Sequence, residues 1–211
     1  MTGKPPRDQR DLVVLVADKD MEQATLQLLQ RPASLGISAP TYEVYTHPAH
    51  DSGCRTASHE LLRSLASQYR FALVLFDHEG SGRDAVDRAQ LERQVEVQLE
   101  ANGWSGRCGV LVLEPELEIW VWTDSSELDQ VIGWAGRQPP VRGWLRTRGF
   151  ELNADGKPRS PKEALREALR HVRKQPSAAL FAALAAKASL SRCTDPAFLK
   201  LKTILQRWFP L

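Results

Sequence analysis

The stretch Phe71–Gly82 reads FALVLFDHEGSG, and it is the part of the sequence that decides the fold. Apolar residues run without a break from Phe71 to Phe76 and stop at Asp77. A short run of this kind, rich in Val, Leu and Phe and followed by a glycine-rich turn, is typical of a β-strand that is buried on both faces. Such strands belong to parallel sheets covered by helices, so the stretch predicts an α/β fold.

The rest of the first 113 residues alternates between similar apolar runs and amphipathic segments. Further strands are expected at 11–17, 41–46 and 108–113, and helices at 21–30, 56–69 and 83–102. This alternation predicts a largely parallel sheet flanked by helices. We expect the α/β domain to span residues 11–135, after a disordered lead-in over residues 1–10.

The last third of the chain differs from the rest in charge. Residues 137–211 hold 16 Lys/Arg and 5 Asp/Glu, a net charge of +11, whereas residues 1–136 hold 12 Lys/Arg and 21 Asp/Glu, a net charge of −9. An acidic half and a basic half indicate two tasks, or two surfaces that meet. We expect a basic connector over 136–159 and a basic helical C-terminal subdomain over 160–211, which opens on a capping box at Ser160.

Composition and cysteine content exclude several classes of protein. The 211 residues are 42% hydrophobic and 26% charged, as in globular proteins that bury a core. No apolar run approaches the length of a membrane span, and the N-terminus lacks the apolar core of a signal peptide. The three cysteines are far apart and odd in number, which favours a reducing compartment. We therefore expect a cytoplasmic protein with no membrane partner.

Acidic residues follow three of the expected strands directly. They are Asp18, Asp20 and Glu22 after the first strand, Asp77 and Glu79 after the central one, and Glu114, Glu116 and Glu118 after the last. The carboxyl ends of parallel strands meet at one edge of the sheet, where ligands bind. An extended backbone points Asp77 and Glu79 the same way, and converging carboxylates can hold Mg²⁺ or Mn²⁺. The alternative is an ordinary surface turn with solvated acids.

Basic and aromatic residues crowd the middle of the chain. Arg142, Arg146 and Arg148 form a candidate strip of contacts to the phosphates of DNA or RNA. Aromatic residues beside a basic stretch can stack on bases, but they more often belong to the core or to the seam between subdomains, which is the interpretation we favour here. The residues concerned are Trp120, Trp122, Trp134 and Trp144.

The acidic residues resemble those of the Toprim fold, which topoisomerases, bacterial primases and overcoming-lysogenization-defect nucleases share. That family places one Glu after its first strand and an Asp-x-Asp pair after a later one, and these residues coordinate Mg²⁺ or Mn²⁺ for phosphodiester chemistry. The sequence Asp77-His78-Glu79 matches the pair, with Glu in its second position. The resemblance implies a Toprim-like sheet and a metal site.

A closer resemblance is to small Toprim-like bacterial proteins of defence islands, among them the Toprim-like component of methylation-associated anti-phage defence systems. The segment Glu118-Ile-Trp120-Val-Trp-Thr-Asp124 matches their Glu-x-Trp-x-x-x-Asp motif. The segment Ser189–Leu205, with Cys193 and Phe198, looks like their C-terminal signature. The resemblance covers nearly the whole chain, through motifs that are short.

The resemblance implies a metal-dependent, nuclease-like component of phage defence. The implied metal ligands are Asp77, Glu79 and Glu116, and the implied catalytic residues are Asp18, Asp20 and Glu118. One position departs from the family, because Ala17-Asp18 stands where Toprim enzymes have Glu-Gly. Either Asp18 or Asp20 replaces that Glu, or the general acid/base is lost. In the second case the chain is an inactive module that binds nucleic acid or another defence protein.

Overall fold

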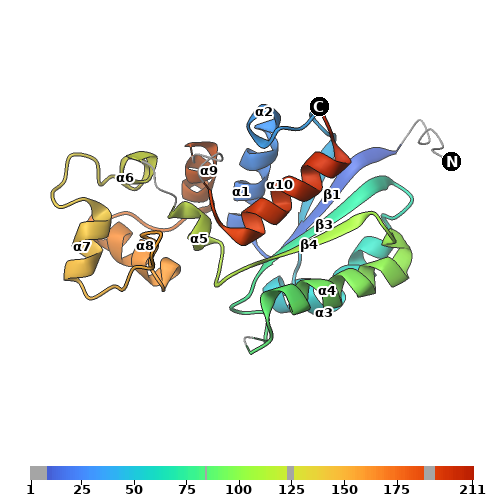
Figure 1. Cartoon of the computed structure of the whole chain (residues 1–211), viewed down its shortest axis with the longest axis horizontal. Helices are drawn as coiled ribbons and strands as arrows, with labels where there is room; N and C mark the ends of the chain where they lie inside the picture. Colours follow the sequence, from blue (N-terminus) through green and yellow to red (C-terminus); the bar gives the residue numbers. More distant parts are fainter. Residues whose placement is uncertain (1–8, 84, 123–125, 188–192) are drawn as a thin grey trace.

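A four-stranded parallel sheet lies at the centre of the chain (Figure 1). The structure is a computed structural model, and it describes residues 9–83, 85–122, 126–187 and 193–211. The strands are β1 (Arg10–Val16), β2 (Tyr42–Thr46), β3 (Tyr69–Asp77) and β4 (Cys108–Leu113). Their order is β2-β1-β3-β4, and each neighbouring pair is parallel. The predicted α/β class and the parallel sheet are therefore confirmed.

Helices cover both faces of this sheet. Helices α1 (Lys19–Leu29) and α10 (Pro196–Trp208) lie over one face, and α3 (His50–Arg63) and α4 (Arg88–Leu99) lie over the other (Figure 1). A short helix, α2 (Pro32–Leu35), follows α1, and a π-helical turn, η1 (Glu100–Trp104), follows α4. Residues 12–16 of β1 and 72–76 of β3 have no exposed surface, as the continuous apolar runs predict.

The order of the strands makes the carboxyl ends of β1 and β3 the expected position for a bound ligand. From β1 the chain moves outward to β2 through α1, and it then crosses back over β1 to β3 through α3. The direction of strand addition reverses between β1 and β3, and open α/β sheets bind ligands beside the carboxyl ends of the strands at such a reversal. Asp18 follows β1 directly and Asp77 ends β3.

The residues after β4 are helical, but they do not gather into one unit. The helices are α5 (Glu118–Val121), α6 (Ser126–Ile132), α7 (Val141–Thr147), α8 (Pro161–His171) and α9 (Ala178–Lys187). In Figure 1, α6, α7 and α8 lie beyond the carboxyl end of the sheet, whereas α9 packs on α1 and α10 returns over β4. None of the helices in the described residues has the length and apolar character needed to cross a lipid bilayer.

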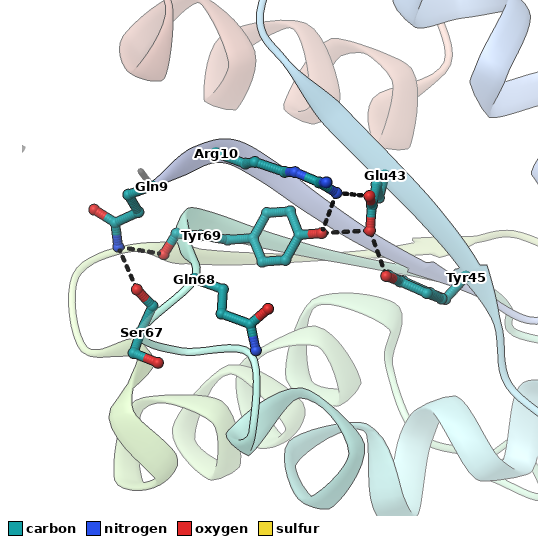
Figure 2. A pocket seen from close by; sticks show the side chains of 7 residues that line it. All are labelled: Gln9, Arg10, Glu43, Tyr45, Ser67, Gln68 and Tyr69. Atoms are coloured by element: carbon teal, nitrogen blue, oxygen red, sulfur yellow. Dashed lines mark hydrogen bonds and ion pairs between the residues drawn. The ribbon is translucent and has the colours of Figure 1, made fainter. Parts of the chain in front are cut away.

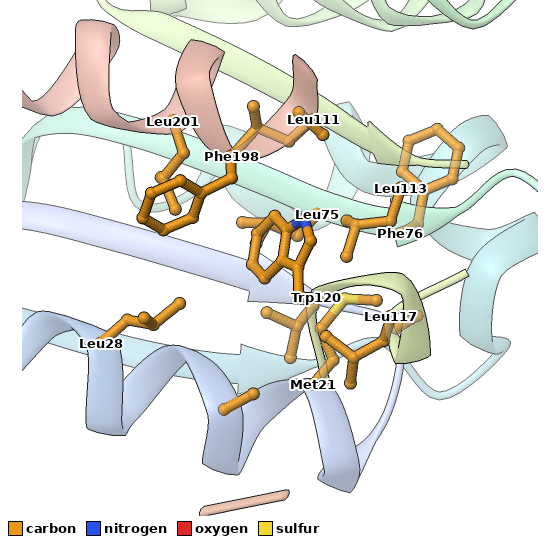
Figure 3. Close-up of a cluster of buried hydrophobic side chains, with 14 of the residues drawn as sticks. Met21, Leu28, Leu75, Phe76, Leu111, Leu113, Leu117, Trp120, Phe198 and Leu201 are labelled. Carbon is orange, nitrogen blue, oxygen red and sulfur yellow. The ribbon is translucent and has the colours of Figure 1, made fainter. Parts of the chain in front are cut away.

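Apolar contacts fix α5 and α10 against the sheet. Figure 3 shows Trp120 of α5 pointing into the core between Met21 of α1 and Phe198 of α10. The rings of Trp120 and Phe198 meet edge to face, with centroids 5.7 Å apart. At the other end of α10, Trp208 stacks on Phe71 at a centroid distance of 4.6 Å. The segment that follows β4 is therefore held firmly against the carboxyl end of the sheet.

Several helix boundaries differ from those predicted. Helix α3 begins at His50 and includes Gly53, which looks like a turn residue in the sequence. A Cβ atom at Gly53 would lie 2.1 Å from Nδ1 of His47, so this glycine serves close packing inside the helix. Helix α4 begins only at Arg88, because the carboxylate of Asp87 caps it by accepting from the two amides at 89 and 90. Residues 32–40 and the connector contain the short helices α2 and α7.

Candidate metal centre

Asp77 is the last residue of β3, and its carboxyl group is buried. Only 7% of the residue is exposed. Its Oδ1 accepts a hydrogen bond of 2.9 Å from the amide of Leu117, and its own amide donates to Oδ1 of Asp51 over 2.8 Å. Asp51 lies in the first turn of α3, so this turn and the segment after β4 both contact the end of β3. The sequence run that defines β3 therefore places Asp77 at the carboxyl end of the sheet, beside the strand reversal.

Two glutamates join Asp77 from the segment that follows β4. Glu116 and Glu118 are 2% and 7% exposed, and Glu118 begins α5. One carboxylate oxygen from each of Asp77, Glu116 and Glu118 lies within 4.8 Å of the other two. We call these three residues the carboxylate cluster. Oxygen donors at this spacing can hold a metal ion, and Mg²⁺, Ca²⁺ and Mn²⁺ are the ions that prefer such donors.

Lys162 is the cation nearest to the carboxylate cluster in the described part of the chain. Its Nζ lies 3.1 Å from Oε2 of Glu116, and its amide donates to Oε1 of the same residue over 2.9 Å. Lys162 lies in the first turn of α8, where Pro161 occupies the first helical position. Burial alone would lower the pKa of Lys162, but the carboxylates of Glu118 and Glu116 raise it to about 12. Lys162 is therefore a permanent cation beside the cluster.

Burial and mutual repulsion raise the pKa values of the cluster. The pKa of Asp77 lies well above its usual value because the carboxyl group is buried and lies near Asp51 and Glu118. Burial raises the pKa of Glu118 to about 7, against the opposing effect of Lys162. Burial also raises the pKa of Glu116, which the ion pair with Lys162 partly offsets. Neighbouring carboxyl groups with raised pKa values are typical of functional sites.

Asp18 and Asp20 lie beyond the carboxyl end of β1, with different local roles. A helix over 21–30, as predicted, would have Asp20 as its N-cap, but the N-cap is Asp18, whose carboxylate accepts a hydrogen bond from the amide of Met21 over 2.9 Å. The backbone of Asp18 is extended, as the residue before a helix requires, whereas Asp20 lies inside the first turn. Burial and the charge of Asp18 raise the pKa of Asp20, and Lys162 lowers it. Both aspartates are thus close enough to interact electrostatically with the carboxylate cluster.

Glu79 lies outside the carboxylate cluster, in contrast to the expectation that it points the same way as Asp77. Strand β3 ends at Asp77, so the alternation of side chains does not continue to Glu79. The chain turns instead, with Gly80 at a φ of +92° and the amide of Ser81 donating to the carbonyl of His78. Glu79 is exposed, and its amide donates to the carbonyl of Pro115. Glu118 takes the third place in the cluster.

The three predicted phosphate-binding arginines lie on or beside α7, and only two of them are exposed. Arg142 is half-buried, because its guanidinium donates to the carbonyls of Gly156 at 3.1 Å and Trp122 at 3.2 Å. Arg146 and Arg148 are exposed, and Arg148 forms an ion pair of 3.3 Å with Glu167. Arg142 therefore ties α7 to its surroundings, and the basic surface is carried by its neighbours.

Two pockets in the described residues lie outside the cluster. One, of about 440 Å³, is lined by polar residues at the amino ends of β1 and β3 (Figure 2). Among its lining residues, Glu43 forms an ion pair with Arg10 and accepts hydrogen bonds from the hydroxyl groups of Tyr45 and Tyr69. The polar groups of these residues therefore have hydrogen-bond partners within the pocket. The pocket lies about 26 Å from Asp77, measured along β3. The other, of about 260 Å³, is bordered by Pro115 and other residues of the segment that carries the glutamates of the cluster.

Lys162 and Asp51 were not among the site residues predicted from the sequence. Lys162 is separated from Asp77 by 85 residues of chain, and its only local signal is a helix-start pattern. Asp51 belongs to a helix whose start was predicted too late. Asp124, at the end of the Glu-x-Trp-x-x-x-Asp motif, lies outside the described residues, as do 189–192 of the C-terminal signature and 1–8 of the lead-in.

Comparisons of the chain with protein-family models, with curated proteins and with solved structures found no match. The resemblance to Toprim-like proteins therefore depends on the short motifs quoted above.

Proposed function

We propose that this protein is a Mg²⁺- or Mn²⁺-dependent enzyme that acts on phosphodiesters of nucleic acid, with a nuclease-like reaction. The observation that carries the proposal is the carboxylate cluster, where oxygens of Asp77, Glu116 and Glu118 lie within 4.8 Å of one another at the strand reversal. Three buried carboxylates at this distance repel one another, and a divalent cation relieves that repulsion. The fold brings the three carboxylates together at the strand reversal, and their oxygens would bind the divalent cation.

The donor set suits Mg²⁺ or Mn²⁺ better than softer metals. All three side chains offer carboxylate oxygen, and among the described residues no cysteine or histidine joins the group. Hard divalent cations prefer oxygen, and Mg²⁺ is commonly held by one or two carboxylates while water and phosphate complete its shell. When bound, such an ion polarises the phosphate and lowers the pKa of water.

The protein's own groups have distinct roles in this proposal. Asp77, Glu116 and Glu118 hold the cation, and Lys162 contacts a phosphate oxygen that approaches beside Glu116. Asp20 stands at the open β1 side, since it is only half-buried, and is the candidate group for moving a proton. Asp18 keeps α1 in place through its cap and adds negative charge near Asp77. Glu79 is exposed at the rim.

The basic surface of the C-terminal half supports nucleic acid as the substrate. Residues 137–211 carry a net charge of +11, and Lys162 brings that half into contact with the cluster. Lysine and arginine bind the phosphate backbone without reading its sequence. The motifs shared with Toprim-like defence proteins place this reaction, in our proposal, in a cytoplasmic anti-phage system in which other defence proteins are partners.

A second candidate function is a binding module without catalysis. It is favoured by the ion pair between Lys162 and Glu116, since a lysine already supplies positive charge where an enzyme would need a metal. The cap made by Asp18 favours it too, because that carboxylate is engaged in the position where Toprim enzymes have a free Glu. In this case the carboxylate cluster is structural and the basic half binds nucleic acid or an acidic partner.

Calorimetric titration with Mn²⁺ tests the proposal most directly. Asp77→Asn keeps the size of the side chain and removes one ligand charge, so we expect binding to weaken at least tenfold. The matched control is Glu92→Gln, which changes a buried acid of α4 outside the cluster and keeps an acceptor oxygen. Equal binding by the wild type and Asp77→Asn would contradict the metal site.

Nicking of supercoiled plasmid in the presence of Mn²⁺ separates the two candidate functions. The enzyme proposal expects cleavage by the wild type, alone or with partner proteins, and loss of cleavage in Asp77→Asn and Asp20→Asn. If Mn²⁺ binds but neither condition gives cleavage above that of the variants, the chain is a binding module.

A further inference from the structure

An aromatic cluster joins three helical segments of the basic half. Trp144 of α7 and His171 at the end of α8 have ring centroids 4.6 Å apart. Trp134, which follows α6, lies 4.8 Å from Trp144 and 5.1 Å from His171, again between centroids. Each of the three rings therefore contacts the other two. We call Trp134, Trp144 and His171 the ring cluster.

The three rings differ in their access to solvent. Trp134 is 2% exposed, and its indole N–H donates to the carbonyl of Pro139 over 3.0 Å, so it forms the floor of the cluster. Trp144 is partly buried, whereas His171 is exposed. The exposed ring of His171 is tilted by 41° against Trp144 and by 34° against Trp134, and its contacts with these two rings fix the position of its outer face. Such a face is what aromatic side chains offer to a nucleobase.

Cationic groups surround the ring cluster. The guanidiniums of Arg137 and Arg148 lie 5.9 Å from the ring centroids of Trp134 and Trp144, respectively. The outer face of α8 carries Arg166 and Arg170, and Arg173 follows the helix. In the described residues no acid lies within ion-pair distance of Arg137, Arg166 or Arg173. Positive charge beside a stacking face fits a polyanion with bases.

Helix α8 connects the ring cluster with the carboxylate cluster. Lys162 in its first turn contacts Glu116, and His171 is its last residue. Nine residues of helix separate the two, which corresponds to about 14 Å along the axis. A single strand of nucleic acid that binds along the outer face of α8 would thus extend from one cluster to the other, a distance of a few nucleotides.

We propose that the ring cluster is a base-stacking platform for single-stranded nucleic acid, with His171 and Trp144 as the contacting rings. Unpaired bases expose their faces, whereas the bases of a duplex are stacked on one another, so the platform selects single strands. The orientation of the strand toward the carboxylate cluster rests on the function proposed above. Binding at the platform itself needs neither metal nor catalysis.

Fluorescence anisotropy with a labelled oligo(dT), measured in EDTA, tests this platform. The comparison ligand is an abasic deoxyribose-phosphate oligomer of the same length, which keeps the phosphates and lacks the bases. We expect His171→Ala to weaken oligo(dT) binding about tenfold, since stacking on one aromatic side chain contributes this order of affinity. The same variant should bind the abasic oligomer as the wild type does. His171→Phe should restore oligo(dT) binding, because it restores a flat ring.

Arg166→Ala is the matched control, because it removes a cation from the outer face of α8 and leaves the rings intact. This variant should lower the affinity for oligo(dT) and for the abasic oligomer by similar factors. The platform is refuted if His171→Ala leaves oligo(dT) affinity unchanged, if it weakens both ligands equally, or if the wild type binds no oligonucleotide. Because oligo(dT) binding is measured in EDTA, it does not depend on a metal ion, so a failure of the metal proposal and a failure of the platform give different results.

Discussion

The ammonium of Lys162 and the carboxylate of Glu116 form a two-point contact at the edge of the carboxylate cluster. The side-chain nitrogen lies 3.1 Å from Oε2, and the amide of the same lysine donates to Oε1 over 2.9 Å. Glu116 is 2% exposed, so this ion pair is shielded on the side of the acid. Lys162 thus neutralises part of the cluster's charge, and a metal ion bound there would have to share Glu116 with it.

Substitution of Lys162 by methionine removes this tethered cation and keeps most of the apolar stem. Without metal, we expect Lys162→Met to lose about 1–2 kcal/mol of unfolding free energy, less than for a fully buried pair because the lysine side chain is about a third exposed. Excess Mn²⁺ should then raise the melting temperature of the variant more than that of the wild type, since the metal supplies the missing charge.

Thermal denaturation in EDTA and in excess Mn²⁺ measures both effects. Lys202→Met, on α10, is the control for the loss of a lysine charge away from the cluster. A rise with Mn²⁺ that is equal in Lys162→Met and in the wild type would show that the lysine and the metal do not compete.

The raised pKa of Glu118 predicts how stability depends on pH. A carboxyl group with an unfolded pKa of 4.5 and a folded pKa of about 7 binds its proton more tightly in the folded state. The unfolded chain releases this proton first as pH rises, so the free energy of unfolding falls between pH 4.5 and 7 and levels off above 7. The full effect is on the order of 3 kcal/mol. The raised pKa of Asp77 also makes the free energy of unfolding fall as pH rises.

Urea denaturation in EDTA across pH 5 to 8 measures this slope. Glu118→Gln should flatten it, because the amide does not titrate. Glu100→Gln, which changes a partly exposed acid at the start of η1, should leave the slope as it is in the wild type. Identical slopes in the wild type and Glu118→Gln would remove Glu118 as the cause. Mn²⁺ affinity should rise over the same pH range, since the metal displaces protons from its ligands.

The fold was predictable from the sequence because its strands are buried on both faces. The continuous apolar run from Phe71 to Phe76 marks β3, because a run this short that ends in a glycine-rich turn favours a buried strand over a buried helix. The limits of the helices were less predictable, because they depend on tertiary contacts. Gly53 reads as a turn residue in the sequence, but its place in α3 reflects the ring of His47, which leaves no room for a Cβ atom at this position.

The candidate site was predictable in part for the same reason. Asp77 was found because it ends a central strand, and the strand order alone brings it to the strand reversal. The position of Glu79 was not predictable from spacing, since the strand ends two residues earlier and the chain turns at Gly80. Lys162 was not predictable either, because its contact with Glu116 depends on how α8 packs against α5.

The carboxylate of Glu92 should stabilise β4, which is an edge strand of the sheet. Glu92 Oε1 accepts from the amide of Val112 over 3.0 Å and from Arg88 over 2.6 Å, and Oε2 accepts from Lys200 of α10 over 3.0 Å. Glu92→Ala leaves a buried amide and two cations without this acceptor, so we expect a loss of about 3 kcal/mol of unfolding free energy. The opened edge should also promote concentration-dependent self-association.

Urea denaturation and size-exclusion chromatography measure these two consequences. The control is Glu100→Ala, which breaks an exposed ion pair with Arg93 near the end of the same helix, so its cost should stay within about 0.5 kcal/mol. Equal stability of Glu92→Ala and Glu100→Ala would mean that the edge of β4 does not need this acid.

The close approach of α10 to β4 at Gly109 gives the last expectation. A Cβ atom at Gly109 would lie 2.9 Å from Cδ1 of Ile204, which is closer than packed carbon atoms come. Gly109→Ala should therefore cost about 1–3 kcal/mol of unfolding free energy through overpacking. Ile204→Val removes the clashing methyl group and by itself should cost about 1 kcal/mol. The double variant should be more stable than the sum of the two losses predicts, since the new methyl fills the space that the old one left. Urea denaturation of the four proteins gives the coupling energy, and strict additivity would show that α10 does not pack on β4 at this position.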